Sequence, residues 1–359
     1  MQRIHWYDWP SRHRSAVAAI AGVLGLVLLM WFIEALLAPS GPAAMPPSHL
    51  GMQVVGFYEN KVPGDGIPSS ESSFNAHYRQ LTQVSPLWFS VTPAGTVLNT
   101  GFDARFVADA EQHHVPVVPL FVNTRGSSQV LLSRAMRRRA AANITQVVQA
   151  DHLSGASIDF ELLSPSSRAD LSRFVHDLSS DLHPQHKVVA VSVFPLLGVP
   201  TSINGAYDYR SLARNADYLV IMAYDHHYSG GLPGPVAPYS WVKNNVVAAL
   251  KEAPPDRLVL SIGMYGYDWI NNGQPGVAPT VADVSAKALA KSYGVPIRYV
   301  AAQSQNEFVY TQNGVSHVVW FMGDRSAAAR VKLARQYHLA GISLWRLGME
   351  EPGFWHVVP

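Results

Sequence analysis

The chain of 359 residues alternates short apolar segments with longer segments whose apolar residues recur at helical spacing. Short runs rich in Val, Ile and aromatic residues predict strands, and near-continuous apolar strands are typical of a parallel sheet buried on both faces. Helical patterns lie between most of these runs. Eight strands are predicted, at 52–58, 86–91, 115–121, 156–160, 188–193, 218–223, 257–263 and 341–345. This arrangement predicts a (β/α)8 TIM barrel of the α/β class, occupying residues 51–359.

The interval between the seventh and eighth predicted strands, residues 264–340, is much longer than the others. It contains strand-like segments of its own at 297–300, 307–310 and 317–321. We therefore expect a small α+β insertion, at about 268–322, on the rim that carries the catalytic groups in barrels of this kind.

The amino-terminal region follows a different pattern. Residues 16–33 form an apolar run without a charge, and Arg3, Arg12 and Arg14 precede it. A run of this length is near the lower limit for a helix that spans a membrane, and basic residues upstream predict a cytoplasmic amino terminus. We expect a cytoplasmic segment at 1–14 and one transmembrane helix at 15–37, which acts as a signal anchor. The working domain would then lie outside the cytoplasm.

A cleaved signal peptide is the alternative, because residues 41–45 (GPAAM) are compatible with a cleavage region. In that case the protein would be secreted. The following residues, 38–50, are rich in Pro, Ala, Gly and Ser and predict a linker.

Charge and cysteine content exclude several classes of function. The 27 Lys and Arg residues nearly balance the 25 Asp and Glu residues, so the chain lacks the basic surface that nucleic-acid binding requires. There is no cysteine, which excludes disulfide bonds and thiolate metal sites.

Two carboxyl groups lie at the end of the fourth predicted strand. Because side chains alternate along a strand, Ser157, Asp159 and Glu161 point the same way. Two ionised carboxylates at this spacing repel each other, so one is expected to keep its proton to higher pH, as a general acid requires. The spacing alone leaves open a solvated structural pair or a helix cap.

The sixth predicted strand continues into Met222, Tyr224 and Asp225, and then into a loop rich in Gly and Pro. A tyrosine hydroxyl and a carboxylate at a strand end can hold a polar group of a substrate. Met222 shares a face with Tyr224 and is expected to pack beside it.

At these residues the chain resembles family 18 of the glycoside hydrolases. Asp159 and Glu161 match the last two acids of the family's fourth-strand motif, residues 222–225 match its Met-x-Tyr-Asp motif, and Trp345 matches the tryptophan beneath the sugar. The stretches at 229–238, 264–269 and 318–326 and the carboxyl-terminal segment are similar to the bacterial spore-cortex and cell-wall branch. Ser154 and Ser157 stand where the fuller motif has its first two acids.

The resemblance implies a retaining reaction in which the 2-acetamido group of the substrate is the nucleophile. Glu161 would be the acid and base, Asp159 would orient the acetamido group, and Tyr224 would donate to its carbonyl oxygen. Asp225 and Trp345 would bind the sugar, together with Met222. The implied partner is a polymer containing N-acetylglucosamine, and no cofactor is needed.

Strand ends often line the site in this fold, so Tyr58 and Asn123 are further candidates for contacts with the substrate. The pairs His113–His114 and His226–His227 do not form a ready metal site, because neighbouring side chains on a strand point in opposite directions. We expect no metal.

Three alternatives stay open from the sequence. The barrel could bind glycan without cleaving it, since a fold does not determine function. The substrate could be an exopolysaccharide of acetylated glucosamine rather than peptidoglycan or a chitin-like polymer. A metal-dependent deacetylase is the third reading, for which no convincing set of His and Asp ligands is present.

Overall fold

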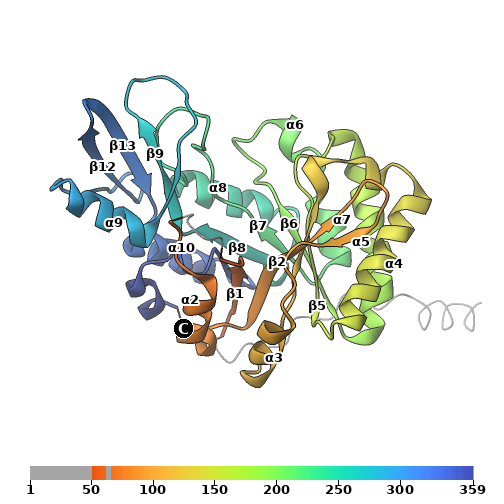
Figure 1. The fold of residues 1–359 in the computed structure, drawn as a ribbon. Coiled ribbons are helices and arrows are strands. Elements are labelled where there is room, and N and C mark those ends of the chain that lie inside the picture. The colour runs from red at the N-terminus through yellow and green to blue at the C-terminus, as the bar shows by residue number, and fades with distance from the viewer. Residues whose placement is uncertain (1–50, 62–65, 359) are drawn as a thin grey trace, which may run out of the picture. The chain divides into compact units, whose positions relative to one another are not determined.

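The computed structural model describes residues 51–61 and 66–358. At its centre eight parallel strands form a closed barrel (Figure 1). The strands are β1 (Gln53–Tyr58), β2 (Gln83–Val91), β4 (Leu120–Asn123), β5 (Gly155–Asp159), β6 (Val188–Val193), β7 (Tyr218–Ile221), β8 (Leu258–Gly263) and β14 (Gly341–Trp345). A short strand, β3 (Val97–Asn99), extends β2 in antiparallel pairing.

Pairing between β1 and both β14 and β2 closes the barrel, with Val55 opposite Ser343 on one side and Gln83 on the other. Alternate side chains point inward and form a small apolar core, which includes Val55, Phe57 and Tyr218. The remaining side chains point outward and pack against the helices in a much larger core. Each of the eight barrel strands is therefore buried on both faces, as its near-continuous apolar sequence predicts.

All eight predicted strands are present, and the third shows the largest difference in position. It was predicted at 115–121, whereas β4 begins at Leu120. Pro116 and Pro119 lack the N–H group that ladder pairing needs, so upstream of β4 only Val117 forms an isolated bridge, to Val84.

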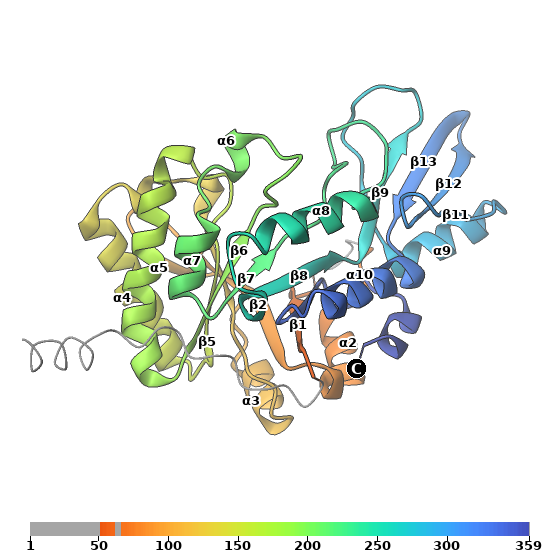
Figure 2. The same ribbon diagram turned by 180° about the vertical axis from the view of Figure 1, so that it is seen from behind.

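Helices follow most barrel strands and cover the outer face. Figures 1 and 2 show α4, α5 and α7 on one side of the barrel, and α8 and α10 alongside β8. Ser133 explains where α4 begins, because its side chain accepts a hydrogen bond from the Met136 N–H at the first turn. The helices are α2 (Ser70–His77), α3 (Ala104–Gln112), α4 (Arg134–Ala150), α5 (Arg168–Leu182), α6 (Thr201–Asn204), α7 (Tyr209–Asn215), α8 (Tyr239–Ala249) and α10 (Asp324–Gln336).

Between β8 and β14 the chain forms a second sheet, with antiparallel strands in the order β10-β9-β13-β12-β11. One helix, α9, packs on this sheet over a separate small core that includes Phe308, Val319 and Phe321. The insertion begins almost directly after β8. Its elements are β9 (Tyr265–Ile270), β10 (Thr280–Ala282), α9 (Asp283–Ser292), β11 (Arg298–Val300), β12 (Gln305–Gln312) and β13 (Val315–Phe321).

The transmembrane helix predicted at 15–37 lies outside the described residues, as do the segments at 1–14 and 38–50. Within the described part of the chain, no helix is both long enough and apolar enough to cross a membrane. The predicted anchor stays a prediction.

Candidate active site

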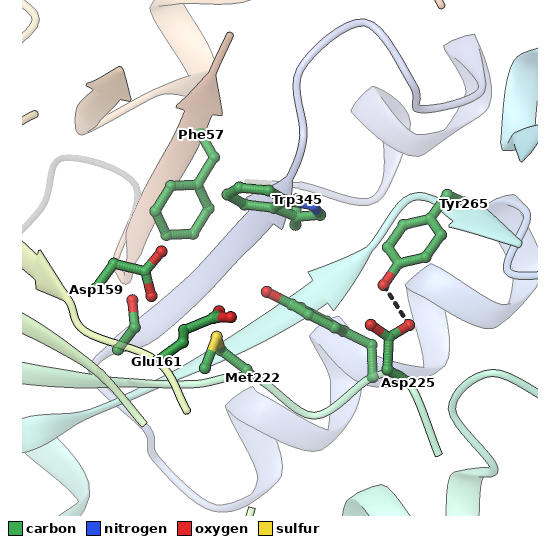
Figure 3. A pocket seen from close by; sticks show the side chains of 9 residues that line it. Phe57, Asp159, Glu161, Met222, Asp225, Tyr265 and Trp345 are labelled. Carbon is green, nitrogen blue, oxygen red and sulfur yellow. Dashed lines mark hydrogen bonds between the residues drawn. The ribbon is translucent and has the colours of Figure 1, made fainter. Parts of the chain in front are cut away.

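A pocket of about 160 Å³ opens where the barrel strands end at their carboxyl termini. This is the face on which barrels of this architecture carry their functional groups. Its walls combine carboxyl and hydroxyl groups with flat apolar side chains (Figure 3). The lining residues are Phe57, Asp159, Glu161, Ser192, Met222, Tyr224, Asp225, Tyr265 and Trp345.

The carboxyl groups of Asp159 and Glu161 lie on the same wall and have different surroundings. Asp159 ends β5 and is buried, and this burial raises the pKa of its carboxyl to about 6 although the Ser192 hydroxyl bonds to it. Burial, together with the nearby charges of Asp159 and Asp225, raises the pKa of the Glu161 carboxyl to about 8. The surroundings therefore favour the protonated form of Glu161 more strongly than that of Asp159.

Asp225 lies at the mouth of the pocket, where the chain leaves β7 in the left-handed region with φ of 60°. Its Oδ1 atom accepts hydrogen bonds from the hydroxyl groups of Tyr265, at 2.6 Å, and Tyr267, at 3.0 Å. Figure 3 shows the first of these bonds. Both tyrosines belong to β9, so the first strand of the insertion orients this carboxylate.

The Tyr224 hydroxyl lies among these acids. Its burial, together with the charges of Asp159 and Glu161, raises its pKa well above the usual value of 10. The group therefore stays protonated across the physiological range and can donate a hydrogen bond to an oxygen in the pocket.

The apolar part of the wall consists of Phe57, Met222 and Trp345. The Phe57 and Trp345 rings meet edge to face, with their centroids 5.3 Å apart and an interplanar angle of 62°. Figure 3 shows both rings across the pocket from Glu161. Flat apolar surfaces opposite hydrogen-bonding groups suit a ligand that is itself flat on one face and polar at its edge, such as a pyranose ring.

Of the eight residues proposed from the sequence, six line this pocket and two do not. The six are Asp159, Glu161, Met222, Tyr224, Asp225 and Trp345. Tyr58 is a correction: its side chain points to the outer layer of the barrel, where its ring centroid lies 4.2 Å from that of Phe106. The alternation of side chains along β1 places its neighbour Phe57 in the pocket instead.

Asn123 also lies outside the pocket lining, because its amide group is engaged by the backbone of Glu161. The Glu161 N–H donates to Asn123 Oδ1 and the Asn123 Nδ2 donates to the Glu161 carbonyl, both at 2.8 Å. The position of Asn123 at a strand end predicts a direct contact with a substrate. The structure instead shows it in contact with the backbone of Glu161.

Phe57, Ser192 and Tyr265 also line the pocket and are not among the residues predicted from the sequence. Phe57 and Ser192 could have been found from strand alternation, since each lies two residues beyond an inward-pointing residue, Val55 and Ala190. Tyr265 begins β9 immediately past the end of β8.

The described residues, 51–61 and 66–358, contain no group of three or more His, Asp or Glu side chains arranged to hold a metal ion. His226 and His227 have other contacts. The His226 ring packs 4.9 Å from that of Trp241, and the His227 Nδ1 lies 2.9 Å from the Leu232 carbonyl oxygen.

Comparison with known proteins agrees with this geometry. The family model described as glycosyl hydrolases family 18 matches residues 113–350, which include both acids and Trp345. The cortical fragment-lytic enzyme of Bacillus anthracis is 30% identical over 312 residues, which cover 81% of this chain and 71% of that enzyme.

Solved structures show the same fold. A chitinase from Chromobacterium violaceum superposes with a TM-score of 0.78 at 28% identity, covering 86% of this chain and 98% of that one. The spore cortex-lytic enzyme SleL of Bacillus cereus superposes with a TM-score of 0.76 at 26% identity, covering 86% of this chain and 73% of that one.

Proposed function

The chain belongs to family 18 of the glycosyl hydrolases and is a glycosidase, and we propose that it cleaves β-1,4 linkages in a polymer containing N-acetylglucosamine. We propose further that it retains the configuration of the anomeric carbon. The observation that carries the proposal is the pair of buried carboxyl groups opposite Trp345 in one pocket, where burial raises the pKa of Asp159 to about 6 and burial with neighbouring charges raises that of Glu161 to about 8.

In the first step Glu161 donates its proton to the glycosidic oxygen as the bond from this oxygen to the anomeric carbon breaks. The carbonyl oxygen of the 2-acetamido group attacks the anomeric carbon from the opposite side and forms an oxazolinium ion. In the second step water attacks the anomeric carbon and gives its proton to the Glu161 carboxylate. The acetamido group is thereby restored, and the anomeric carbon returns to its original configuration.

The other pocket residues assist the acetamido group and the sugar ring. Asp159 accepts the amide N–H and offsets the positive charge that develops on the oxazolinium ion. Tyr224 donates to the acetamido carbonyl oxygen, because its hydroxyl remains protonated. Asp225, held by two tyrosines, binds a sugar hydroxyl, while Trp345, Phe57 and Met222 form the apolar surface under the ring.

The substrate proposed is peptidoglycan or a chitin-like polymer. The relatives named above include a cortical fragment-lytic enzyme and a chitinase, and these names support a substrate of this kind. An exopolysaccharide of acetylated glucosamine is the competing substrate, because it would present the same acetamido group to Asp159.

The test compares the full chain, extracted with detergent, with its Glu161→Gln variant. Both are incubated with peptidoglycan, chitooligosaccharides and poly-N-acetylglucosamine, and products are identified by mass spectrometry. The parent protein should release products with reducing-end N-acetylglucosamine from one of them, and the variant should be slower by at least about a hundredfold.

Equal cleavage by both proteins would show that Glu161 is not the acid. Binding of one glycan without cleavage by either protein would favour a barrel that only binds. The polymer that is cut identifies the substrate.

We also propose that residues 15–37 anchor the enzyme in the cell membrane, with the barrel on the extracytoplasmic side. This rests on the uncharged run at 16–33 and the arginines before it. In fractionated cells the full chain should remain with membranes at high salt, and a chain lacking residues 1–37 should not. A full chain found entirely in the soluble fraction at its uncleaved mass would contradict the proposal.

A further inference from the structure

Glu161 lies beyond the last residue of its strand. β5 ends at Asp159, so the backbone of Glu161 takes no part in the ladder that aligns the rest of the strand. The next residue, Leu162, has a φ of 52° and is 60% exposed, so the chain turns outward directly after the acid. The direction of the Glu161 side chain must therefore depend on contacts outside the sheet.

Two side chains from other parts of the barrel supply these contacts. Asn123, at the end of β4, is only 7% exposed and bonds to both the N–H and the carbonyl oxygen of Glu161, at 2.8 Å each. Tyr207, just before α7, is buried and donates its hydroxyl proton to the Phe160 carbonyl oxygen at 2.7 Å. Asn123 therefore reaches the backbone at 160–161 from the end of β4, and Tyr207 reaches it from the segment between β6 and β7.

We propose that Asn123 is a positioning residue that keeps the Glu161 carboxyl inside the pocket, with Tyr207 supporting the preceding peptide. This proposal rests on the role proposed above for Glu161. Asn123 suits the task because a single amide group offers one acceptor and two donors, which is enough to bond both backbone groups of one residue.

The carboxyl group would otherwise tend to leave the pocket. Asp159 from β5 and Asp225 after β7 face it with like charge, and the hydroxyl groups of Tyr224 and Tyr207 lie near it without a compensating charge. Ionised Glu161 gains hydration and loses repulsion by turning toward solvent. The hydrogen bonds to its backbone limit that movement, so they maintain the surroundings that keep the acid protonated.

The chain contains a matched control for this contact. Asn245 of α8 is likewise buried and bonds to both backbone groups of one loop residue, Leu197, at 2.7 Å to its N–H and 3.1 Å to its carbonyl oxygen. Leu197 carries no titratable group and does not line the pocket. Asn245→Ala therefore removes a similar pair of hydrogen bonds without affecting the acid.

The experiment measures kcat, KM and the pH profile of the full chain and of its Asn123→Ala, Asn123→Asp and Asn245→Ala variants. For Asn123→Ala we expect kcat to fall at least about tenfold and KM to stay within about twofold, because the acid is misplaced while the sugar contacts remain. The alkaline limb of the pH profile should move to lower pH, because a Glu161 carboxyl that turns toward solvent loses its proton more easily. Asn245→Ala should change neither kcat nor the limb.

Asn123→Asp keeps the shape of the side chain and serves if the Ala variant does not fold. It can still accept from the Glu161 N–H but cannot donate to the carbonyl oxygen, so kcat should again fall while KM stays within about twofold. Its added negative charge would itself raise the pKa of Glu161, so the alkaline limb is compared only in Asn123→Ala. An unchanged alkaline limb in folded Asn123→Ala, or an unchanged kcat in Asn123→Asp, would overturn the proposal. So would an equal loss of kcat in Asn245→Ala.

A second measurement does not depend on activity. The Glu161 carboxyl is titrated by carbon-13 NMR of glutamate-labelled protein and assigned by the loss of its signal in Glu161→Gln. Its pKa should be lower in Asn123→Ala than in the parent, and an unchanged pKa would overturn the positioning role. If the parent cleaves no glycan, the proposed function fails, yet this titration still decides whether Asn123 positions the carboxyl.

Discussion

Asp159 ends β5 and Glu161 follows two residues later, and the surroundings of the two carboxyl groups in the pocket raise their pKa values to different degrees. Asp159 is buried and accepts a hydrogen bond from the Ser192 hydroxyl, whereas Glu161 lies near the carboxyl groups of Asp159 and Asp225. The same two side chains on an open surface would both be ionised at neutral pH. The difference in pKa between the two carboxyl groups is therefore a property of the pocket.

This difference predicts a bell-shaped dependence of kcat/KM on pH. In the proposed mechanism Glu161 must be protonated to donate to the glycosidic oxygen, so activity should fall as pH rises through about 8. Asp159 must be ionised to offset positive charge, so activity should also fall as pH drops through about 6. The profile of the full chain on its best substrate checks this, and the Asp159→Asn variant should lose the acid limb. A rate that keeps rising above pH 9 would contradict the assignment of the acid.

The raised pKa of Glu161 also predicts an effect on stability. Its pKa is higher in the folded chain than in the unfolded chain, so folding is favoured at low pH and this contribution is lost as pH rises toward about 8. Glu161→Gln removes the charge and should raise Tm by at least about 2 °C at pH 8.5 but change it little at pH 4. Calorimetry at the two pH values measures this. An equal Tm difference at both would show that the gain has another cause.

At the scale of elements, the insertion contributes directly to the pocket. β9 provides the two tyrosines that hold Asp225, and their hydroxyl groups reach a residue 40 to 42 positions earlier in the chain. Arg330 of α10 joins the same region to the barrel: its buried guanidinium donates to Ser304, Ser326 and the Ala237 carbonyl oxygen. The position of the insertion therefore depends on a few polar contacts as well as on apolar packing.

Removing this guanidinium should destabilise the fold. Arg330→Ala leaves several buried carbonyl groups without their donor, and we expect a loss of about 3 kcal/mol in the free energy of unfolding. In a thermal scan Tm should fall by roughly 5 °C or more. Arg335→Ala on the same helix is the control, because Arg335 is exposed. Similar Tm values for the two variants would refute a structural role for Arg330.

The strands could be predicted from the sequence because each apolar run is buried on both faces. The same property hides which side chains point inward, so a strand-end pattern predicts Tyr58 as a contact although Phe57 lines the pocket. On β5 the polar residues themselves mark the inward face, so the shared orientation of Asp159 and Glu161 could be predicted. The contacts of Tyr265 with Asp225, and of Asn123 with Glu161, join distant segments that no local pattern connects.

At the scale of the whole molecule, the fold brings side chains from six separate segments of the chain to one pocket. Phe57 and Trp345 approach from neighbouring strands on one side, and the carboxyl groups approach from β5 and the end of β7 on the other. The pocket contains the carboxyl groups of Asp159, Glu161 and Asp225. In the proposed reaction the nucleophile comes from the substrate, so the group that attacks the anomeric carbon is what an experiment must identify.

The most direct test observes the anomer that forms first. The full chain is mixed with chitooligosaccharide, or with the glycan that it cleaves best, and proton NMR follows the new reducing end before mutarotation. Attack by the acetamido group followed by water predicts that the β-anomer appears first, and that the same oligosaccharide without its N-acetyl groups is not cleaved. An initial α-anomer, or equal cleavage of the deacetylated substrate, would contradict the mechanism.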